Sequence, residues 1–462
     1  MLAALALSLL ATEAHAHAGC GGHEIGRRNL GLMNPRQAAP TNVASGAVSI
    51  DPAFECTDYY YEPASKLVPL YPPVWPENNV TGAQECADIL PNDTEAMALF
   101  QPINATLNAK FPNDRPHGTL LGDFAGVQYN YTDPDCWWSW AKCDTPKADT
   151  GLQPDITTVP TPETWGLGFD DGPNCSHNAL YDYLQENNQR ATMFYIGSNV
   201  LDWPLQALRA TTDGHQICVH TWSHKYMTAL TNSQAFAELY YARKVIKDLL
   251  GVTPQCWRPP YGDVDNRIRY IASQLNLTTI VWSDDSQDWR EGVPADNVTA
   301  ADVTLNYQAV VDKVSNGTYI NHGPVVLTHE LTNFTMSEFI SQYPSIKNAF
   351  KHVAPLCVAY NITHPYVETD IVCPSFSQYI SGTINISSST PMDSSSSSSS
   401  GTTSMSGSMT GSMTGSATSS GTSASATSKS DTKTGSATPA MKSSFGLGAS
   451  LLGAMVAGLL LA

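Results

Sequence analysis

Two aspartates, Asp170 and Asp171, stand side by side in the stretch GFDDGP, which begins at Gly168. An apolar run typical of a buried strand precedes them, and the Gly-Pro pair that follows is typical of a turn. Adjacent carboxylates repel each other, and moving them out of water costs free energy unless a cation or hydrogen-bond donors compensate. The stretch is therefore either a solvated turn or a site in which the two acids have different tasks.

Two histidines four residues apart, His220 and His224, occur in the stretch HTWSH. On a helix they would lie on one face, so both imidazoles could bind the same ion. With a carboxylate from Asp170 or Asp171 and one position open to water, they would form a hydrolytic metal site. The charge of the ion would also offset the repulsion between the two acids. The alternative is that both histidines are ordinary surface or capping residues.

Hydrolysis at such a site also needs a base that takes a proton from water and an acid that protonates the leaving group. One of the two aspartates could be the base, and Arg258 could orient it. His329 could be the acid, and Asp288 could hold and charge its imidazole. Taken singly, each of these three residues is more often part of a structural salt bridge or a capped strand end.

The elements that must position these side chains lie between about residues 162 and 357, where strand-like runs alternate with helix-like stretches. The strand-like runs are TWGLGF, ATMFYIG, QICVH, QCWR, TTIVWS and GPVVLTH. The clearest helix begins at Ala235 and ends before Gly251, with apolar residues at three- and four-residue spacing. This alternation predicts parallel pairing and an α/β barrel, in which catalytic residues gather where the strands end.

The stretches FDDGP, HTWSH, RPPYG, DSQDW and LTH occur in the order, and at roughly the spacing, of the five motifs of the NodB-type polysaccharide deacetylases. The resemblance to this family, carbohydrate esterase family 4, covers residues 161–380 and implies a distorted (β/α) barrel. Gly168 stands where many members carry Thr. Glu330 follows His329 where Asp is frequent, which would alter the rim of the site.

The resemblance also implies an activity, namely metal-dependent removal of N-acetyl groups from β-1,4-linked GlcNAc in cell-wall chitin. The products would be chitosan and acetate. Two other functions remain compatible with the motifs: deacetylation of another glycan, such as acetylated xylan or peptidoglycan-type glycan, and a catalytically silent role as a wall-binding mannoprotein. The intact set of motif residues weakens the last alternative.

Around the metal, the resemblance implies that Asp170 is the general base and that Arg258 positions it. The expected metal ligands are Asp171, His220 and His224, and the expected ion is zinc or cobalt.

On the substrate side, the resemblance implies that Asp288 supports His329 as the general acid. The backbone N–H of Tyr261 is expected to contribute to the oxyanion hole. Trp289 and Trp222 are expected to line the sugar site.

The composition fits a secreted or cell-surface protein. The chain has 462 residues, of which 42% are hydrophobic, and a formal net charge of −18. This length allows a large core plus appendages, and the acidic balance argues against nucleic acid, whose phosphates need a basic surface. We expect a monomer that binds chitin or chito-oligosaccharides within the glycan of the cell wall.

Both ends of the chain predict a secretory route to the cell surface. Residues 1–18 have the apolar run and small residues of a signal peptide, and residues 381–444 form a Ser/Thr-rich stalk that we expect to be disordered. Residues 445–462 are apolar to the last residue, and no basic residues follow them. They therefore fit a removed GPI-anchor signal better than a transmembrane helix, with attachment at Gly435 or Ser430. The lipid would hold the protein at the plasma membrane and in the cell wall.

Residues 19–160 predict an irregular, disulfide-braced N-terminal extension that packs on the barrel. The chain has ten cysteines, and an even number in an exported protein suggests disulfides. Cys136 and Cys143 are close enough for a local bridge, whereas Cys218 and Cys256 could be paired or could be buried thiols. The three tryptophans of CWWSWAKC could stack on sugars or could form an aromatic mini-core.

Sequons for N-glycosylation are spread along the chain and predict a heavily glycosylated protein. Asn174 is set aside because Cys is the middle residue of its sequon. The asparagines expected to carry glycans are Asn79, Asn92, Asn104, Asn130, Asn276, Asn297, Asn316, Asn333, Asn361 and Asn385.

Overall fold

The computed structural model of the chain describes residues 61–73, 86–111, 116–175 and 178–382. The predicted signal peptide, GPI tail, attachment site and nearly all of the stalk lie outside these residues, as do Asn79 and Asn385. Among the helices described, none is long and apolar enough to cross a membrane.

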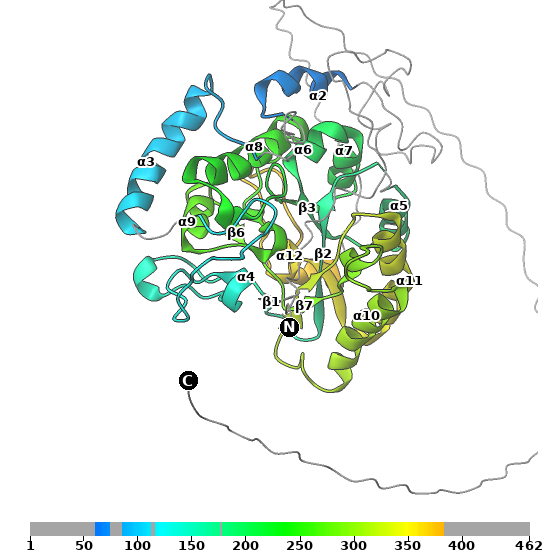
Figure 1. Ribbon diagram of the computed structural model, residues 1–462. Helices are drawn as coiled ribbons and strands as arrows, with labels where there is room; N and C mark the ends of the chain where they lie inside the picture. Colours follow the sequence, from blue (N-terminus) through cyan, green and yellow to red (C-terminus); the bar gives the residue numbers. More distant parts are fainter. Residues whose placement is uncertain (1–60, 74–85, 112–115, 176–177, 383–462) are drawn as a thin grey trace, which may run out of the picture. The chain divides into compact units, whose positions relative to one another are not determined.

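A parallel six-stranded sheet forms the centre of the fold (Figure 1), as the alternation of strands and helices predicts. Further parallel bridges, Gly166 to Val325 and Asp170 to His329, join its long strand to the segment that contains the last predicted strand. The sheet therefore curls into the distorted barrel. In spatial order its strands are β10 (His352–Pro355), β2 (Thr164–Gly172), β3 (Thr192–Tyr195), β4 (Gln216–Val219), β5 (Cys256–Trp257) and β6 (Thr278–Thr279). The two remaining pairs are β1 (Thr158–Val159) with β8 (Gly323–Pro324), and β7 (Asp284–Asp285) with β9 (Val326–Leu327).

Helices cover the outside of the strands (Figure 1). The helix predicted from Ala235 begins three residues earlier, because Thr231 and Gln234 form a capping box, and it ends at Gly251 in the left-handed conformation. In chain order the α-helices of the barrel are α5 (Asn178–Glu186), α6 (Gly197–Asp202), α7 (Pro204–Thr212), α8 (Asn232–Leu250), α9 (Asn266–Gln274), α10 (Ala300–Ser315), α11 (Asn333–Ala349), α12 (Leu356–Ala359) and α13 (Phe376–Ile380). The short 3-10 helices are η1 (Val68–Leu70), η2 (Ala148–Thr150), η3 (Met227–Ala229), η4 (Pro260–Gly262) and η5 (Asp288–Arg290).

The core lies on both sides of β2, which is buried along its whole length. The ring of Phe169 packs edge-to-face against Phe339 of α11 at 4.7 Å between centroids. A disulfide between Cys218 and Cys256 joins β4 to β5, which decides in favour of pairing for these two cysteines. The core therefore fixes the strand whose end carries the two adjacent aspartates.

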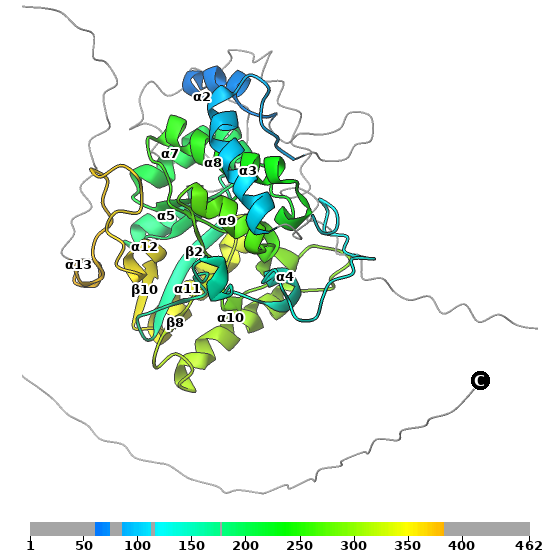
Figure 2. The ribbon, with the colours of Figure 1, turned by 90° about the vertical axis from the view of Figure 1, so that its left-hand side faces the viewer.

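The N-terminal extension packs on the barrel, as predicted, but it contains a 17-residue helix that was not predicted, α3 (Thr94–Lys110). Asp93 caps this helix by accepting a hydrogen bond from the Ala96 N–H, and the helix continues through Pro102. Figure 2 shows α3 beside α8 and α9, and the ring of Phe100 contacts Phe236 of α8. The extension also contains α2 (Glu62–Leu67) and α4 (Trp138–Ala141).

The segment CWWSWAKC is closed by the predicted local disulfide between Cys136 and Cys143. Trp137 is fully buried and donates its indole N–H to Asp263 at 2.7 Å, and Trp138 is also buried. Trp140 is the exposed member of the three. Trp137 stacks on Trp140 and contacts further aromatic rings, which is the aromatic mini-core that was one of the two alternatives.

Candidate active site

The two adjacent aspartates occupy the carboxyl end of β2, and both side chains are buried, Asp170 at 2% and Asp171 at 4% exposure. The pairing with β3 skips Asp171, whose φ is 74°, so this residue forms a β-bulge. Side chains of a regular strand alternate between its two faces, and the bulge breaks that alternation. Both carboxylates consequently reach the same imidazole: the distances to His220 Nε2 are 3.9 Å from Asp170 Oδ2 and 3.2 Å from Asp171 Oδ1.

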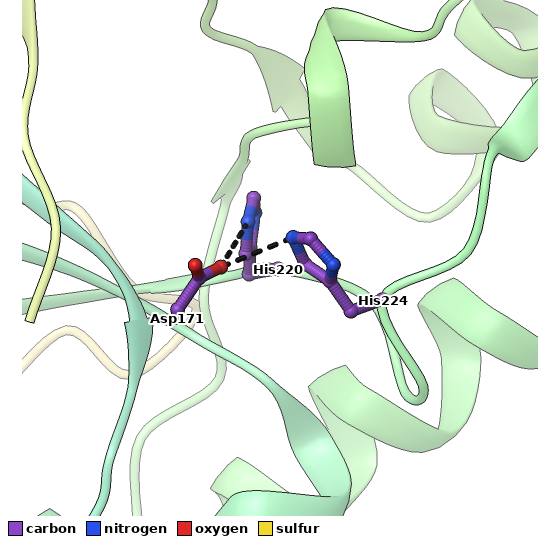
Figure 3. Close-up of side chains that lie close together, drawn as sticks. All are labelled: Asp171, His220 and His224. Carbon is purple, nitrogen blue, oxygen red and sulfur yellow. Dashed lines mark ion pairs between the residues drawn. The ribbon is translucent and has the colours of Figure 1, made fainter. Parts of the chain in front are cut away.

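Asp171, His220 and His224 lie together as predicted (Figure 3). Asp171 Oδ1 is 3.2 Å from His220 Nε2 and 3.0 Å from His224 Nε2, and one ligand atom from each residue lies within 4.8 Å of the others. Two imidazoles and one carboxylate are the donor set of a catalytic divalent-metal site. The three residues therefore fit a divalent ion.

The expectation that the two histidines share a helix face was wrong, because residues 220–226 form a loop after β4. Thr221 and His224 have φ angles of 65° and 53°, and the following α-helix begins only at Asn232. The His224 N–H donates to Thr221 Oγ1 at 3.1 Å, which folds the loop back on itself. This turn, and not helical periodicity, directs both imidazoles toward Asp171.

The protonation of the three residues suits metal binding. His220 Nδ1 lies 2.8 Å from the Arg258 carbonyl, which can only accept, so Nδ1 carries a proton and Nε2 is the nitrogen that faces Asp171 and could bind an ion. Burial lowers the pKa of His224, against the opposing effect of Asp171, and so favours a neutral ring. Burial alone would raise the pKa of Asp171, but the two imidazoles hold it well below its usual range.

Asp170 has a different partner from Asp171. Arg258 Nη1 lies 2.6 Å from Asp170 Oδ1, and the guanidinium is fully buried with its carbon 3.9 Å from the centroid of the Phe194 ring. A buried ion pair of this kind fixes the direction of the carboxylate. Arg258 therefore contacts Asp170, the acid that it was expected to orient.

His329 and Asp288 form the second predicted pair. Asp288 is fully buried, and its two oxygens lie 2.6 Å from His329 Nδ1 and 3.0 Å from the His329 backbone nitrogen. Burial would lower the pKa of His329, but the Asp288 carboxylate reverses this and raises the pKa to about 10. The parallel bridge between Asp170 and His329 places this imidazolium on the segment next to the end of β2, near the paired acids.

The residues expected on the substrate side fall into two groups. Tyr261, with a φ of 58°, lies in the turn after β5, and its half-buried ring is 4.8 Å from the His224 ring. Trp289 is half-buried and follows Asp288 directly. Trp222 is different: its indole is fully buried, stacks on Tyr71 and donates to a backbone carbonyl of the extension, so it does not line the sugar site.

Two acids near the site differ from what the sequence led us to expect. Glu330 is fully buried and accepts a 2.8 Å hydrogen bond from the Tyr181 hydroxyl, so it does not lie at the rim. Glu238 was not predicted at all, although it is fully buried in α8 beside the loop that carries the two histidines. The signal available in the sequence was a single acid in the otherwise apolar run AFAELYYA.

Comparison with known proteins shows to which protein family the chain belongs. The model of the polysaccharide deacetylase family matches residues 158–280. Chitin deacetylase 2 of Cryptococcus neoformans var. grubii is 63% identical over 388 residues, which cover 84% of this chain and 83% of that protein. The chitin deacetylase of Amylomyces rouxii is 44% identical over 343 residues, 73% of this chain and 77% of that one. The chain therefore belongs to the polysaccharide deacetylase family.

Among solved structures, the chitin deacetylase of Colletotrichum lindemuthianum aligns with a TM-score of 0.41 and 20% identity. The alignment covers 45% of this chain and 92% of that one.

The Asp288–His329 pair generates a pH prediction. With a pKa of about 10, His329 stays protonated through neutral pH and loses its proton only as the pH rises through that value. Asp288→Asn removes the negative charge that raises the pKa of His329. We therefore expect the alkaline fall of kcat to move to lower pH, and kcat at neutral pH to drop. Deacetylation rates between pH 6 and 11 measure this, with the exposed Asp312→Asn as control. An unchanged alkaline limb would make Asp288 a structural partner only.

Proposed function

We propose that this chain is a chitin deacetylase that hydrolyses N-acetyl groups of β-1,4-linked GlcNAc to give chitosan and acetate. The observation that carries the proposal is the cluster of Asp171, His220 and His224 beside a second acid, Asp170, that has its own cationic partner. The names of the relatives at 63% and 44% identity support the choice of chitin as the substrate.

The proposed mechanism assigns the ion to Asp171, His220 and His224. A divalent ion held there, which we propose is zinc or cobalt, would polarise the acetamide carbonyl and increase the acidity of a water molecule. Asp170 accepts the proton of the attacking water. Arg258 holds that carboxylate in position through the 2.6 Å ion pair.

His329 then protonates the amide nitrogen as the C–N bond breaks, which releases the free amine of glucosamine and leaves acetate. Asp288 keeps the imidazole charged before this step. The backbone N–H of Tyr261 donates to the oxygen that becomes negative in the transition state, and Trp289 packs against the sugar ring. Support for these roles comes from the short contacts of His329 and from the partial exposure of the other two side chains.

The division of labour between the paired acids predicts different failures for their amides. Asp171→Asn should lose metal, because a charged ligand becomes neutral, and activity should partly return in excess zinc or cobalt. Asp170→Asn should retain metal but lose ~10²–10⁴-fold in turnover, because no group remains to take the proton. Metal content by mass spectrometry, measured beside acetate release, separates the two. Equal loss of metal in both variants, or full activity in both, would contradict the proposal.

Two alternative functions remain as outcomes of one substrate test. Acetate release from a series of chitin oligomers should exceed release from acetylated xylan or peptidoglycan-type glycan, and chelator should abolish it. Preferential release from another glycan would keep the mechanism and change the substrate. Binding to chitin with no release of acetate from any glycan would favour the catalytically silent wall-binding mannoprotein.

For the location, we propose a glycosylated, monomeric protein held at the plasma membrane and cell wall by a GPI lipid attached at Gly435. The apolar tail and Ser/Thr-rich stalk support the anchor. Among the predicted glycosylation sites that the structure describes, all asparagines but Asn104 are exposed, which supports their glycosylation; Asn104 is half-buried. The exposed residues are Asn92, Asn130, Asn276, Asn297, Asn316, Asn333 and Asn361.

The anchor has a direct test. Phosphatidylinositol-specific phospholipase should move the full-length protein out of the detergent phase, and deletion of residues 445–462 should send active protein into the medium. Peptides from residues 450–462 in the mature protein would contradict removal of the tail.

A further inference from the structure

Other parts of the chain form hydrogen bonds to the peptide groups of the loop between the two histidines. The carbonyls of Thr221 and Trp222 accept hydrogen bonds from Gly197 N–H at 2.8 Å and Ser198 N–H at 3.2 Å, at the start of α6. A Cβ at Gly197 would lie 2.7 Å from both the Trp222 ring and the backbone of α8, so only glycine permits this approach. The carbonyl side of the loop is therefore fixed by a neighbouring helix.

The amide side of the loop is fixed by one carboxylate, Glu238 of α8. Its Oε2 accepts from Trp222 N–H and Ser223 N–H, both at 2.8 Å, and its Oε1 accepts from Ser223 Oγ at 2.6 Å. Glu238 is fully buried, as are Trp222 and Ser223 to within 1%. A buried carboxylate that accepts hydrogen bonds from two amides and a hydroxyl of one short loop restrains that loop strongly.

The same carboxylate contacts the N-terminal extension. Ala87 N–H donates to Glu238 Oε1 at 2.7 Å, while Trp222 stacks on Tyr71 at 5.5 Å and donates to the Pro73 carbonyl at 3.1 Å. Four donors thus converge on the two oxygens of Glu238, three from the loop and one from the extension. The extension completes the support of the loop that carries His220 and His224.

We propose that Glu238 is a positioning residue for the metal site, which holds the Thr221–Ser223 loop so that His220 and His224 both face Asp171. The proposal rests on the metal-binding function proposed above. Without the carboxylate, the loop amides would be buried without acceptors, and the loop would relax toward another conformation. Since His224 has a φ of 53°, such relaxation would move the imidazole away from Asp171.

Glu238→Gln tests this role with little change in volume. A glutamine offers one accepting oxygen, so it can serve either the two loop amides or Ala87 N–H, and its NH2 group then faces a donor. Loss of a group that orients a metal ligand typically costs 10–100-fold in metal affinity. We therefore expect about a 10-fold or greater rise in the zinc Kd, measured by competition with a chelator. The visible spectrum of the cobalt-loaded protein should also change, because it reports ligand geometry.

Glu368→Gln is the matched control. Glu368 also bridges distant segments, since it accepts from Thr253 N–H at 2.6 Å, Thr253 Oγ1 at 2.7 Å and Lys247 Nζ at 2.7 Å, but it does not contact the loop. Its loss should lower thermal stability and leave both the zinc Kd and the cobalt spectrum unchanged. The two variants therefore separate positioning of the ligands from general support of the fold.

Ser223→Ala provides a second variant if Glu238→Gln does not fold. It removes only the hydroxyl donor to Glu238. Because one contact that orients the loop is lost, we expect the zinc Kd to rise by about 3-fold. A zinc Kd within 2-fold of wild type, and an unchanged cobalt spectrum, in whichever of these variants folds would overturn the proposal. If wild-type protein itself binds no zinc or cobalt, the proposed metal site fails instead.

Discussion

Two carboxylates that are adjacent in the chain are both buried although like charges repel, and the site depends on how this conflict is resolved. The bulge at Asp171 lets both side chains enter the site, and the structure then gives each acid a separate positive or polar environment. Arg258 pairs with Asp170, while the imidazoles of the HTWSH loop surround Asp171. Because each acid has its own partners, the two adjacent carboxylates can have different roles despite their mutual repulsion.

The groups around the acids are held by buried partners from distant parts of the chain. Asp288 fixes His329 through both of its oxygens, and Glu238 does the same for the loop between the two histidines. Each partner is fully buried, so its hydrogen bonds are not in competition with water. The extension takes part in this support through Ala87, whose N–H donates to Glu238.

The sequence predicted the barrel because strand-like runs and helices alternate, and it predicted a metal site at the strand ends because polar residues follow those runs. The choice of Asp171 over Asp170 as the carboxylate ligand came from the family resemblance alone. It could not predict the HTWSH loop, whose conformation depends on hydrogen bonds to Gly197 and Glu238 rather than on its own residues. The burial of Trp222 likewise depends on Tyr71, about 150 positions earlier in the chain. Helix α3 was missed because the Pro- and Asn-rich composition of the extension outweighed a good capping residue, Asp93.

The central claim is that Asp171, and not Asp170, binds the ion together with the two histidines. Anomalous diffraction at the zinc absorption edge, from crystals of the zinc-loaded protein, tests this most directly. The account predicts one strong peak within bonding distance of Asp171, His220 Nε2 and His224 Nε2, with the Asp170 carboxylate still paired to Arg258. A peak bound by Asp170 in place of Asp171, or no peak at this end of β2, would contradict it.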